Sequence, residues 1–226
     1  MKSQLQRAYL AVASLLLVFG ATTAQAALGT IVGSKHDFSS TSASAFKGTS
    51  NQTCVYCHAP HNTGATLLWN RAANSATYTL YNAAISSTIN ATVGQPGAVS
   101  KLCLSCHDGA VAVDNFGGAT GGTNKVTGKP NLGSDLSNDH PIGFVYNAGL
   151  VTSDPGLRAV STSVTIGAAN TGTLEAKMLF GATGAATVEC ASCHDVHNST
   201  SGTAVEAKLL RVTTASSALC TTCHVK

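Results

Sequence analysis

Charged and aromatic side chains are scarce in this 226-residue chain. Only 10% of its residues are Asp, Glu, Lys or Arg, less than half of the roughly 25% that is usual in soluble domains. Aromatic residues make up 5%, and the chain has one Trp and two Met. Because large apolar side chains are few, we expect something other than aliphatic packing to hold the protein together.

Basic side chains do not cluster either. The 13 Lys and Arg exceed the 10 Asp and Glu, which gives a formal net charge of +3. They are scattered singly along the chain, whereas a nucleic-acid-binding surface needs a basic patch. Nucleic acid is therefore not an expected partner.

No apolar run is long enough to cross a membrane, because a spanning helix needs about 20 residues. The run over residues 8–19 follows Lys2 and Arg7 and precedes the small-residue sequence Ala24-Gln25-Ala26. This order is typical of a secretory signal peptide. We expect residues 1–26 to be removed and the rest to be secreted to the extracellular space or cell surface. A periplasmic location is the alternative.

Against this background the eight Cys and eight His stand out. Every Cys lies in a CxxCH motif: Cys54, Cys57 and His58; Cys103, Cys106 and His107; Cys190, Cys193 and His194; Cys220, Cys223 and His224. In c-type attachment, two thiols add across the two haem vinyl groups, and the following His can reach the iron as the proximal ligand. Disulfides would not require that His, and a zinc site of four thiolates would ignore it. The motifs predict four covalently bound haem c groups.

The remaining histidines equal the predicted haems in number: His36, His61, His140 and His197. Beyond the signal peptide there is one Met, Met178, so at most one iron could have His/Met ligation. Bis-histidine ligation of all four irons is the economical interpretation, although any one of these residues taken alone could be an ordinary hydrogen-bonding histidine.

A chain whose irons all have two protein ligands has no open position for a small substrate. We therefore expect electron transfer and no enzymatic activity. Three acidic residues, Asp108, Asp195 and Glu189, lie beside the motifs but form no paired-carboxylate pattern. We expect them to be solvated or to hydrogen-bond the ligating imidazoles.

The chain contains an internal duplication. CVYCHAPHN at residues 54–62 and CASCHDVHN at residues 190–198 both fit CxxCHxxHN, and a second CxxCH follows in each half. Leu67-Leu68 with Arg71 aligns with Leu209-Leu210-Arg211. One free histidine, His36 or His140, precedes each half, so each half supplies a complete two-haem set.

The two histidines of CxxCHxxH are too close in sequence to bind opposite faces of one haem. We expect His61 to reach the Cys103/Cys106 haem and His197 the Cys220/Cys223 haem. His36 and His140 are then left for the Cys54/Cys57 and Cys190/Cys193 haems, or for a haem in another chain.

The expected fold is a multihaem cytochrome c, mostly irregular coil with short helices and few strands packed around four haems. The Gly-, Thr- and Ser-rich stretch 108–188 is expected to be irregular, with one short strand within residues 158–166. Trp69, Tyr78 and Tyr81 are expected to pack on haem edges. The predicted units are the signal peptide 1–26, a first two-haem module 27–109, a Gly-rich connector 110–139 and a second two-haem module 140–226.

The motif order narrows the class. CxxCHxPH followed by LWN, then CLSCHDG, an HP dipeptide, ECxSCHxxH and a terminal CxxCH resembles the doubled-CxxCH cytochromes. More closely, it resembles the tetrahaem outer-surface cytochromes that polymerise into extracellular conducting filaments in metal-reducing bacteria and some archaea. The resemblance implies stacked bis-His haems and a distal histidine donated to the neighbouring protomer, for which His36 is the candidate.

Three functions compete at this point. The leading hypothesis is a homopolymeric extracellular filament that conducts electrons to external acceptors. The second is a monomeric periplasmic electron shuttle that exchanges electrons with redox partner cytochromes. The third, a multihaem reductase, requires a vacant iron position.

Overall fold

The computed structural model describes residues 31–59, 61, 68–72, 74–167, 169–199 and 208–225, so the predicted signal peptide lies outside the described residues. Regular elements are few and short. In chain order they are the 3-10 helix η1 (Cys54–Tyr56), α2 (Ala98–His107), α3 (Ala148–Ser153), β1 (Ser163–Ile166), β2 (Asn170–Thr173), α4 (Leu174–Met178), α5 (Cys190–Cys193), the 3-10 helix η3 (Ala215–Ser217) and α6 (Ala218–Cys223). The expectation of a mostly irregular backbone with short helices and few strands is confirmed.

The β1–β2 hairpin is antiparallel, with Ser163 opposite Thr173 and Ile166 opposite Asn170. Val164 and Ile166 of β1 are buried and the residues between them are exposed, which is the two-residue period of a half-buried strand. The sequence predicted this strand within residues 158–166. It missed β2, whose sequence NTGT has no apolar alternation.

The prediction of an irregular stretch over residues 108–188 is wrong from α3 onward. Side-chain caps explain the two short helices there: Asn147 accepts a hydrogen bond from the Leu150 N–H at 3.0 Å, and Thr173 accepts one from the Ala176 N–H at 3.2 Å. Such caps satisfy backbone donors that a helix start leaves unpaired. Two isolated polar residues thus start helices that apolar periodicity did not predict.

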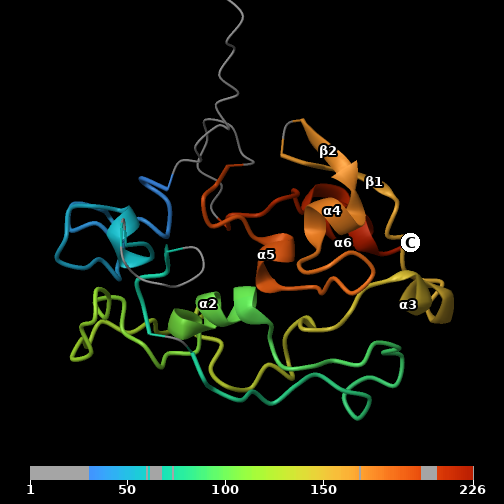
Figure 1. Ribbon diagram of the computed structural model, residues 1–226, viewed down its shortest axis with the longest axis horizontal. Coiled ribbons are helices and arrows are strands. Elements are labelled where there is room, and N and C mark those ends of the chain that lie inside the picture. The colour runs from blue at the N-terminus through green and yellow to red at the C-terminus, as the bar shows by residue number, and fades with distance from the viewer. Residues whose placement is uncertain are drawn as a thin grey trace, which may run out of the picture.

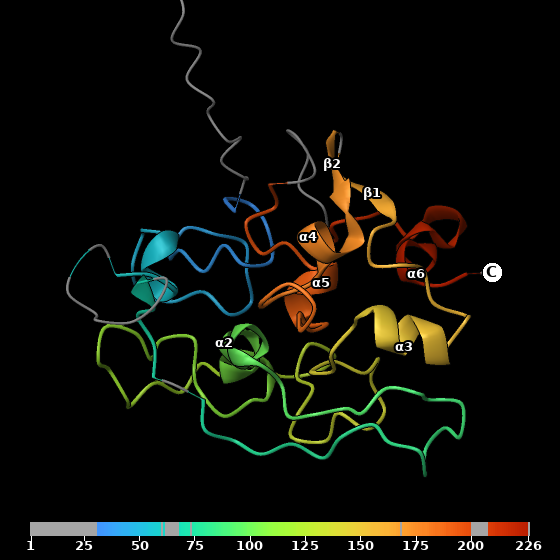
Figure 2. The same cartoon turned by 45° about the vertical axis from the view of Figure 1, so that its right-hand side comes forward.

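The four Cys-bearing segments extend across the molecule, as the two views in Figures 1 and 2 show. The η1 segment lies at one side, and α2 packs on α5 in the middle. The α6 helix lies at the other side, near the C-terminus. Segments from the two halves of the sequence therefore meet at the α2–α5 contact.

Buried apolar residues form three small clusters rather than one core. The largest surrounds α4 and the hairpin and contains Met178, which is 1% exposed. The second contains Phe38, Tyr56, Val113 and Val126. A third joins Tyr78 and Leu104 to Leu136. Residues 110–139 contain no helix or strand, yet Val113, Val126 and Leu136 from this connector fill the clusters of the first half.

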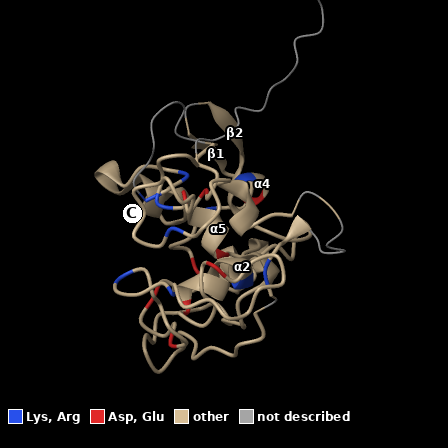
Figure 3. Ribbon diagram, turned by 90° about the vertical axis from the view of Figure 1, so that its left-hand side faces the viewer, with Lys and Arg blue, Asp and Glu red and all other residues tan. Residues whose placement is uncertain are grey.

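The positions of Lys and Arg and those of Asp and Glu are scattered along the ribbon among many uncharged residues (Figure 3). Within the described part of the chain, no helix has the length and apolar character that a membrane span requires.

Candidate haem-binding site

Each CxxCH sequence forms about one turn of helix. In three of the motifs the N–H of the histidine donates to the carbonyl of the first Cys: His58 to Cys54 at 2.9 Å, His194 to Cys190 at 3.1 Å and His224 to Cys220 at 2.9 Å. The remaining motif is the last turn of α2, which ends at His107. Residues three apart on a helix share a face, so both sulfurs of a pair lie on one side, as attachment to a single haem requires.

The two CxxCHxxH segments fold alike. A leucine with positive φ follows each motif, Leu68 at 52° in the first half and Leu209 at 53° in the second. The residue after that leucine forms a β-bridge with the motif histidine, Trp69 with His58 and Leu210 with His194. One residue later, Asn70 Nδ2 donates to the Val55 carbonyl at 2.7 Å, and Arg211 Nε donates to the Ala191 carbonyl at 2.6 Å. Asn70, rather than Arg71, is therefore the structural counterpart of Arg211, which corrects the sequence alignment of the halves.

Three pairs of histidine rings face each other, and each pair joins a motif histidine to one of the other four. The ring centroids are 6.0 Å apart for His107 and His36, 6.1 Å for His58 and His197, and 6.4 Å for His224 and His140. The angles between the ring planes are 50°, 19° and 76°, in the same order.

These separations suit an iron atom between the two rings. A metal–imidazole bond is about 2 Å and the nitrogen lies about 1.1 Å from the ring centre, so opposed ligands have ring centres about 6 Å apart. No group of three or more His, Cys, Asp or Glu side chains in the described ranges could hold a bare metal ion. The donor set thus consists of opposed imidazole pairs beside paired thiols, which fits haem c with two axial histidines.

Backbone carbonyls orient several of these rings. His107 Nδ1 is 2.7 Å from the Pro130 carbonyl, His194 Nδ1 is 2.9 Å from the Lys208 carbonyl, and His140 Nδ1 is 3.0 Å from its neighbour Pro141. A hydrogen bond at Nδ1 fixes the tautomer and leaves Nε2 as the free donor for a metal. Asp108, Asp195 and Glu189 were expected to be solvated or to hydrogen-bond the imidazoles, but at these three rings the partner is a carbonyl, and Asp195 and Glu189 are buried.

His36 is partly buried, and its Nδ1 atom is shielded from solvent without a hydrogen-bond partner. Burial, followed by the charges of His107, His194 and His197, lowers the pKa of His36 to about 4. The ring is therefore neutral at pH 7, which is the form that binds a metal.

The ring pairs differ from the ligand assignment made from the sequence. His36, not His61, faces the motif histidine of the Cys103/Cys106 site. His140, not His197, faces His224 of the Cys220/Cys223 site. Both of these pairs lie within one half of the chain. Because α2 packs on α5, the two halves also lie against each other, which allows a pair to form between them.

His197 accordingly faces His58 in the first half. The structure places His61 on the surface.

A buried polar contact holds α2 on α5. Ser100 Oγ donates to Glu189 Oε2 and accepts from the Cys190 N–H at 2.9 Å, and Thr187 Oγ1 donates to Glu189 Oε1 at 2.7 Å. Ser100 and Glu189 are 0% and 3% exposed. Nothing in the local sequence marks Ser100, since its partners lie far along the chain.

The same contact brings two attachment sites together. The Cys103 and Cys190 thiols share a hydrogen bond, which raises the pKa of Cys103 and lowers that of Cys190. Elsewhere burial dominates and raises the pKa of the Cys57 and Cys223 thiols to about 11. The second and third CxxCH sites are therefore side by side.

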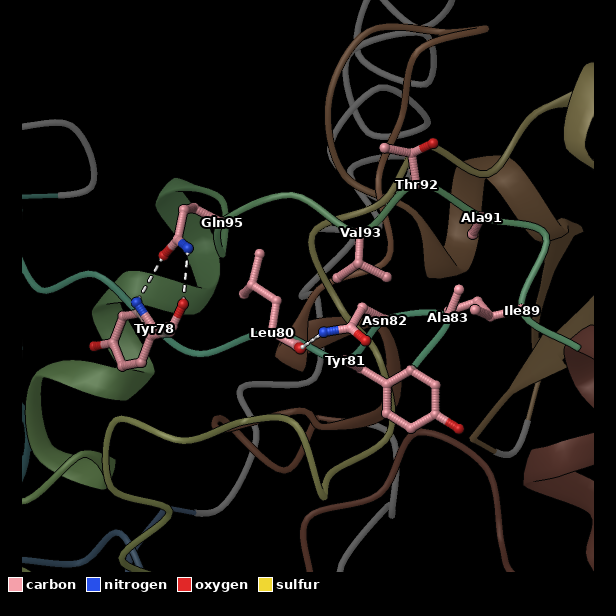
Figure 4. A pocket seen from close by; sticks show the side chains of 10 residues that line it. All are labelled: Tyr78, Leu80, Tyr81, Asn82, Ala83, Ile89, Ala91, Thr92, Val93 and Gln95. Atoms are coloured by element: carbon pink, nitrogen blue, oxygen red, sulfur yellow. Dashed lines mark hydrogen bonds between the residues drawn. The ribbon is translucent and has the colours of Figure 1, made fainter. Parts of the chain in front are cut away.

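Of the aromatic residues singled out from the sequence, Trp69 lies beside a motif histidine. The Trp69 ring meets the His58 ring at 6.1 Å between centroids. Tyr78 and Tyr81 instead line an uncharged cavity of about 490 Å³, together with Leu80 and Val93. Figure 4 shows the two hydrogen bonds between Gln95 and the Tyr78 backbone at one end of this cavity, both 2.9 Å.

Comparison with known proteins agrees with this chemistry. A family model described as the doubled CXXCH motif matches residues 183–226, which include the third and fourth sites. No curated protein matches the chain. The matched motif and the opposed histidine pairs together support a multihaem c-type cytochrome with covalently bound haem c.

Proposed function

We propose that this chain is a tetrahaem electron-transfer protein in which every haem iron has two histidine ligands. The observation that carries the proposal is the set of three opposed ring pairs, each of which joins a CxxCH histidine to one histidine outside the CxxCH motifs. Met178 is buried in the apolar cluster around α4, so a histidine remains the best candidate at each iron.

The fourth pair follows from the duplication. His58 of the first CxxCHxxH faces His197 of the second. If the two similar segments exchange histidines symmetrically, His194 of the second pairs with His61 of the first. This would fill the fourth iron and use all eight histidines.

The haems, when bound, supply the one-electron couples. The chain's own residues would attach them through the eight Cys thiols and would offer each iron two histidines. An iron held by two histidines would have no place for a further ligand, which favours electron transfer over reductase chemistry. We propose that the protein works outside the cytoplasm, either secreted or periplasmic.

Two assemblies would use the same haems. A carrier that completes its haems within one chain is favoured by His36, which lies against His107 of its own chain instead of being free for a neighbour. An extracellular filament is favoured by the resemblance of the motif order to polymerising cytochromes. We therefore propose the self-contained carrier first and the filament as the second candidate.

The test uses protein purified from an exporting host that attaches haem c. Intact mass should correspond to four haems, and the reduced protein should show only low-spin spectra that carbon monoxide does not change. A mass with fewer haems, or a carbon monoxide complex in the native protein, would contradict the proposal. Electron microscopy of the same sample separates the assemblies, because a filament shows a short axial repeat and a carrier gives uniform small particles.

His61→Ala tests the symmetric exchange. The variant should keep four haems and convert one of them to a high-spin form, visible in absorption and electron paramagnetic resonance spectra. His61 is exposed, so the substitution should not affect folding. If every haem of the variant stayed low-spin, the assignment of His61 to His194 would be wrong.

A further inference from the structure

Arg71 carries a buried positive charge that the haem ligation does not use. The residue is 9% exposed, and its guanidinium donates to three backbone carbonyls: Nη1 to Tyr56 at 3.1 Å and to Val113 at 2.9 Å, and Nη2 to Ala112 at 2.5 Å. Its Nε has no partner. All the acceptors are neutral, so the charge is solvated by carbonyl dipoles and is not paired with an anion.

The charge lies between the first two attachment sites. Tyr56 is inside the first CxxCH motif, and the Ala112 and Val113 carbonyls follow the second. Cys57 and Cys106 both pack on the apolar cluster that contains Tyr56 and Val113. The Arg71 guanidinium therefore binds the backbone of the first site and of the segment after the second, beside a cluster on which one attachment cysteine of each site packs.

A guanidinium stays protonated at any pH that a protein survives, and burial makes an unpaired charge costly. Three carbonyls arranged around it lower that cost, because they replace part of the lost water. A charge acts most strongly on its neighbours where water is excluded. The presence of a buried Arg at position 71, where an apolar side chain would be less costly, therefore points to an electrostatic role.

Neither arginine in the described part of the second half is buried to this extent. Arg158 and Arg211 are both partly buried, and Arg211, which corresponds to Asn70 in the backbone, lies 5.9 Å over the Phe180 ring. Arg211 is only partly buried, so solvent screens its charge more strongly. The duplication thus provides an internal comparison between a buried and a screened arginine.

We infer that Arg71 raises the reduction potential of the haems at the first two CxxCH sites, because its buried charge opposes the extra positive charge of ferric iron. Reduction of each haem adds one electron to ferric iron and gives ferrous iron, with no bond made or broken. The inference rests on the proposed function, in which both sites carry haem c.

The experiment is a spectroelectrochemical titration of the purified holoprotein at pH 7, with intact mass and low-spin spectra recorded for each variant. Arg71→Met removes the charge, Arg71→Lys keeps it, and Arg211→Met is the matched control. In Arg71→Met, the reduction potential of two of the four haems should fall by at least about 59 mV. At a fixed applied potential this raises their ferric-to-ferrous ratio at least tenfold, as expected for a one-electron couple. Arg71→Lys and Arg211→Met should each change this ratio by roughly threefold or less.

Superimposable titrations of Arg71→Met and the unaltered protein, with four haems in each, would overturn the inference. An equal shift in Arg71→Lys would also overturn it, since loss of geometry would then explain both results. If Arg71→Met did not accumulate with four haems, Arg71→Gln would decide, because it keeps amide donors for the carbonyls without the charge. A mass showing no haem at the first two sites of the unaltered protein would instead refute the proposed function.

Discussion

Ser100→Ala is expected to weaken the contact between α2 and α5. Ser100 Oγ is buried between the Glu189 carboxylate, to which it donates, and the Cys190 N–H, from which it accepts. Alanine would leave each of those groups with one hydrogen bond fewer, in a place that water does not reach. A bond to a charged group contributes about 1.5–3 kcal/mol, and a buried unsatisfied donor costs about 1–3 kcal/mol. The two effects overlap, and together they predict a loss of about 3 kcal/mol in the free energy of unfolding.

The assay is guanidinium denaturation of the holoprotein, followed by the Soret band for axial ligation and by circular dichroism for the backbone. For a chain of this size a denaturant slope of about 5 kcal/mol per molar is reasonable, so a loss of 3 kcal/mol lowers the midpoint by about 0.6 M. Both signals should shift, since the contact joins two CxxCH segments.

Ser87→Ala is the matched control, because Ser87 is exposed. Its midpoint should be unchanged to within about 0.1 M, as expected for a surface substitution of less than 0.5 kcal/mol. Glu189→Gln keeps an acceptor for Ser100 but removes its charge, and should fall between the two. A Ser100→Ala midpoint equal to that of Ser87→Ala would refute the argument that this contact stabilises the junction of the halves.

Two further predictions concern the ligands and the pH. In electron paramagnetic resonance, the oxidised protein should give a rhombic low-spin signal from the haem with the nearly parallel rings of His58 and His197. The haem with the nearly perpendicular rings of His140 and His224 should give a more anisotropic signal, and His140→Ala should remove that signal selectively. Burial, followed by a carboxylate neighbour, raises the pKa of Tyr78 from 10.0 to about 12, so its contribution to stability should be complete below pH 10 and lost as the pH rises to 12. Unfolding midpoints measured across this range should decline less in Tyr78→Phe; an identical decline would contradict the assignment.

The attachment sites could be read from the sequence because their chemistry is local. Two thiols and a histidine lie within five consecutive residues, and one helical turn is enough to place them, as η1, α5 and α6 show. The scarcity of large apolar residues predicted that aliphatic packing alone would not hold the protein together, and the buried clusters of the described residues are small and separate.

The distal ligands could not be read in the same way. His197 and His61 occupy equal positions in the repeat, so the sequence favoured partners within each half. The choice depends on α2 packing on α5, and the residues that fix this contact, Ser100 and Glu189, have no local pattern. Strand β2 and the capped helices after residue 147 were missed for a related reason, since single polar side chains and pairing partners determine them.

The pairing of His58 with His197 makes the two halves interdependent. An independent two-haem module would take its ligands from its own sequence, whereas here the first site is attached in one half and faced by a histidine from the other. Under the proposed ligation, the bonds to that iron hold the halves together alongside the Glu189–Ser100 contact, so neither half can fill its sites alone. For an electron carrier this arrangement has a direct advantage. Tunnelling rates fall steeply with distance, and haems joined through shared ligand segments are separated by bonds and packed side chains. Residues 110–139 connect the halves and also complete the apolar clusters of the first half, so under the proposed ligation both packing and ligand bonds would set the spacing of the redox centres.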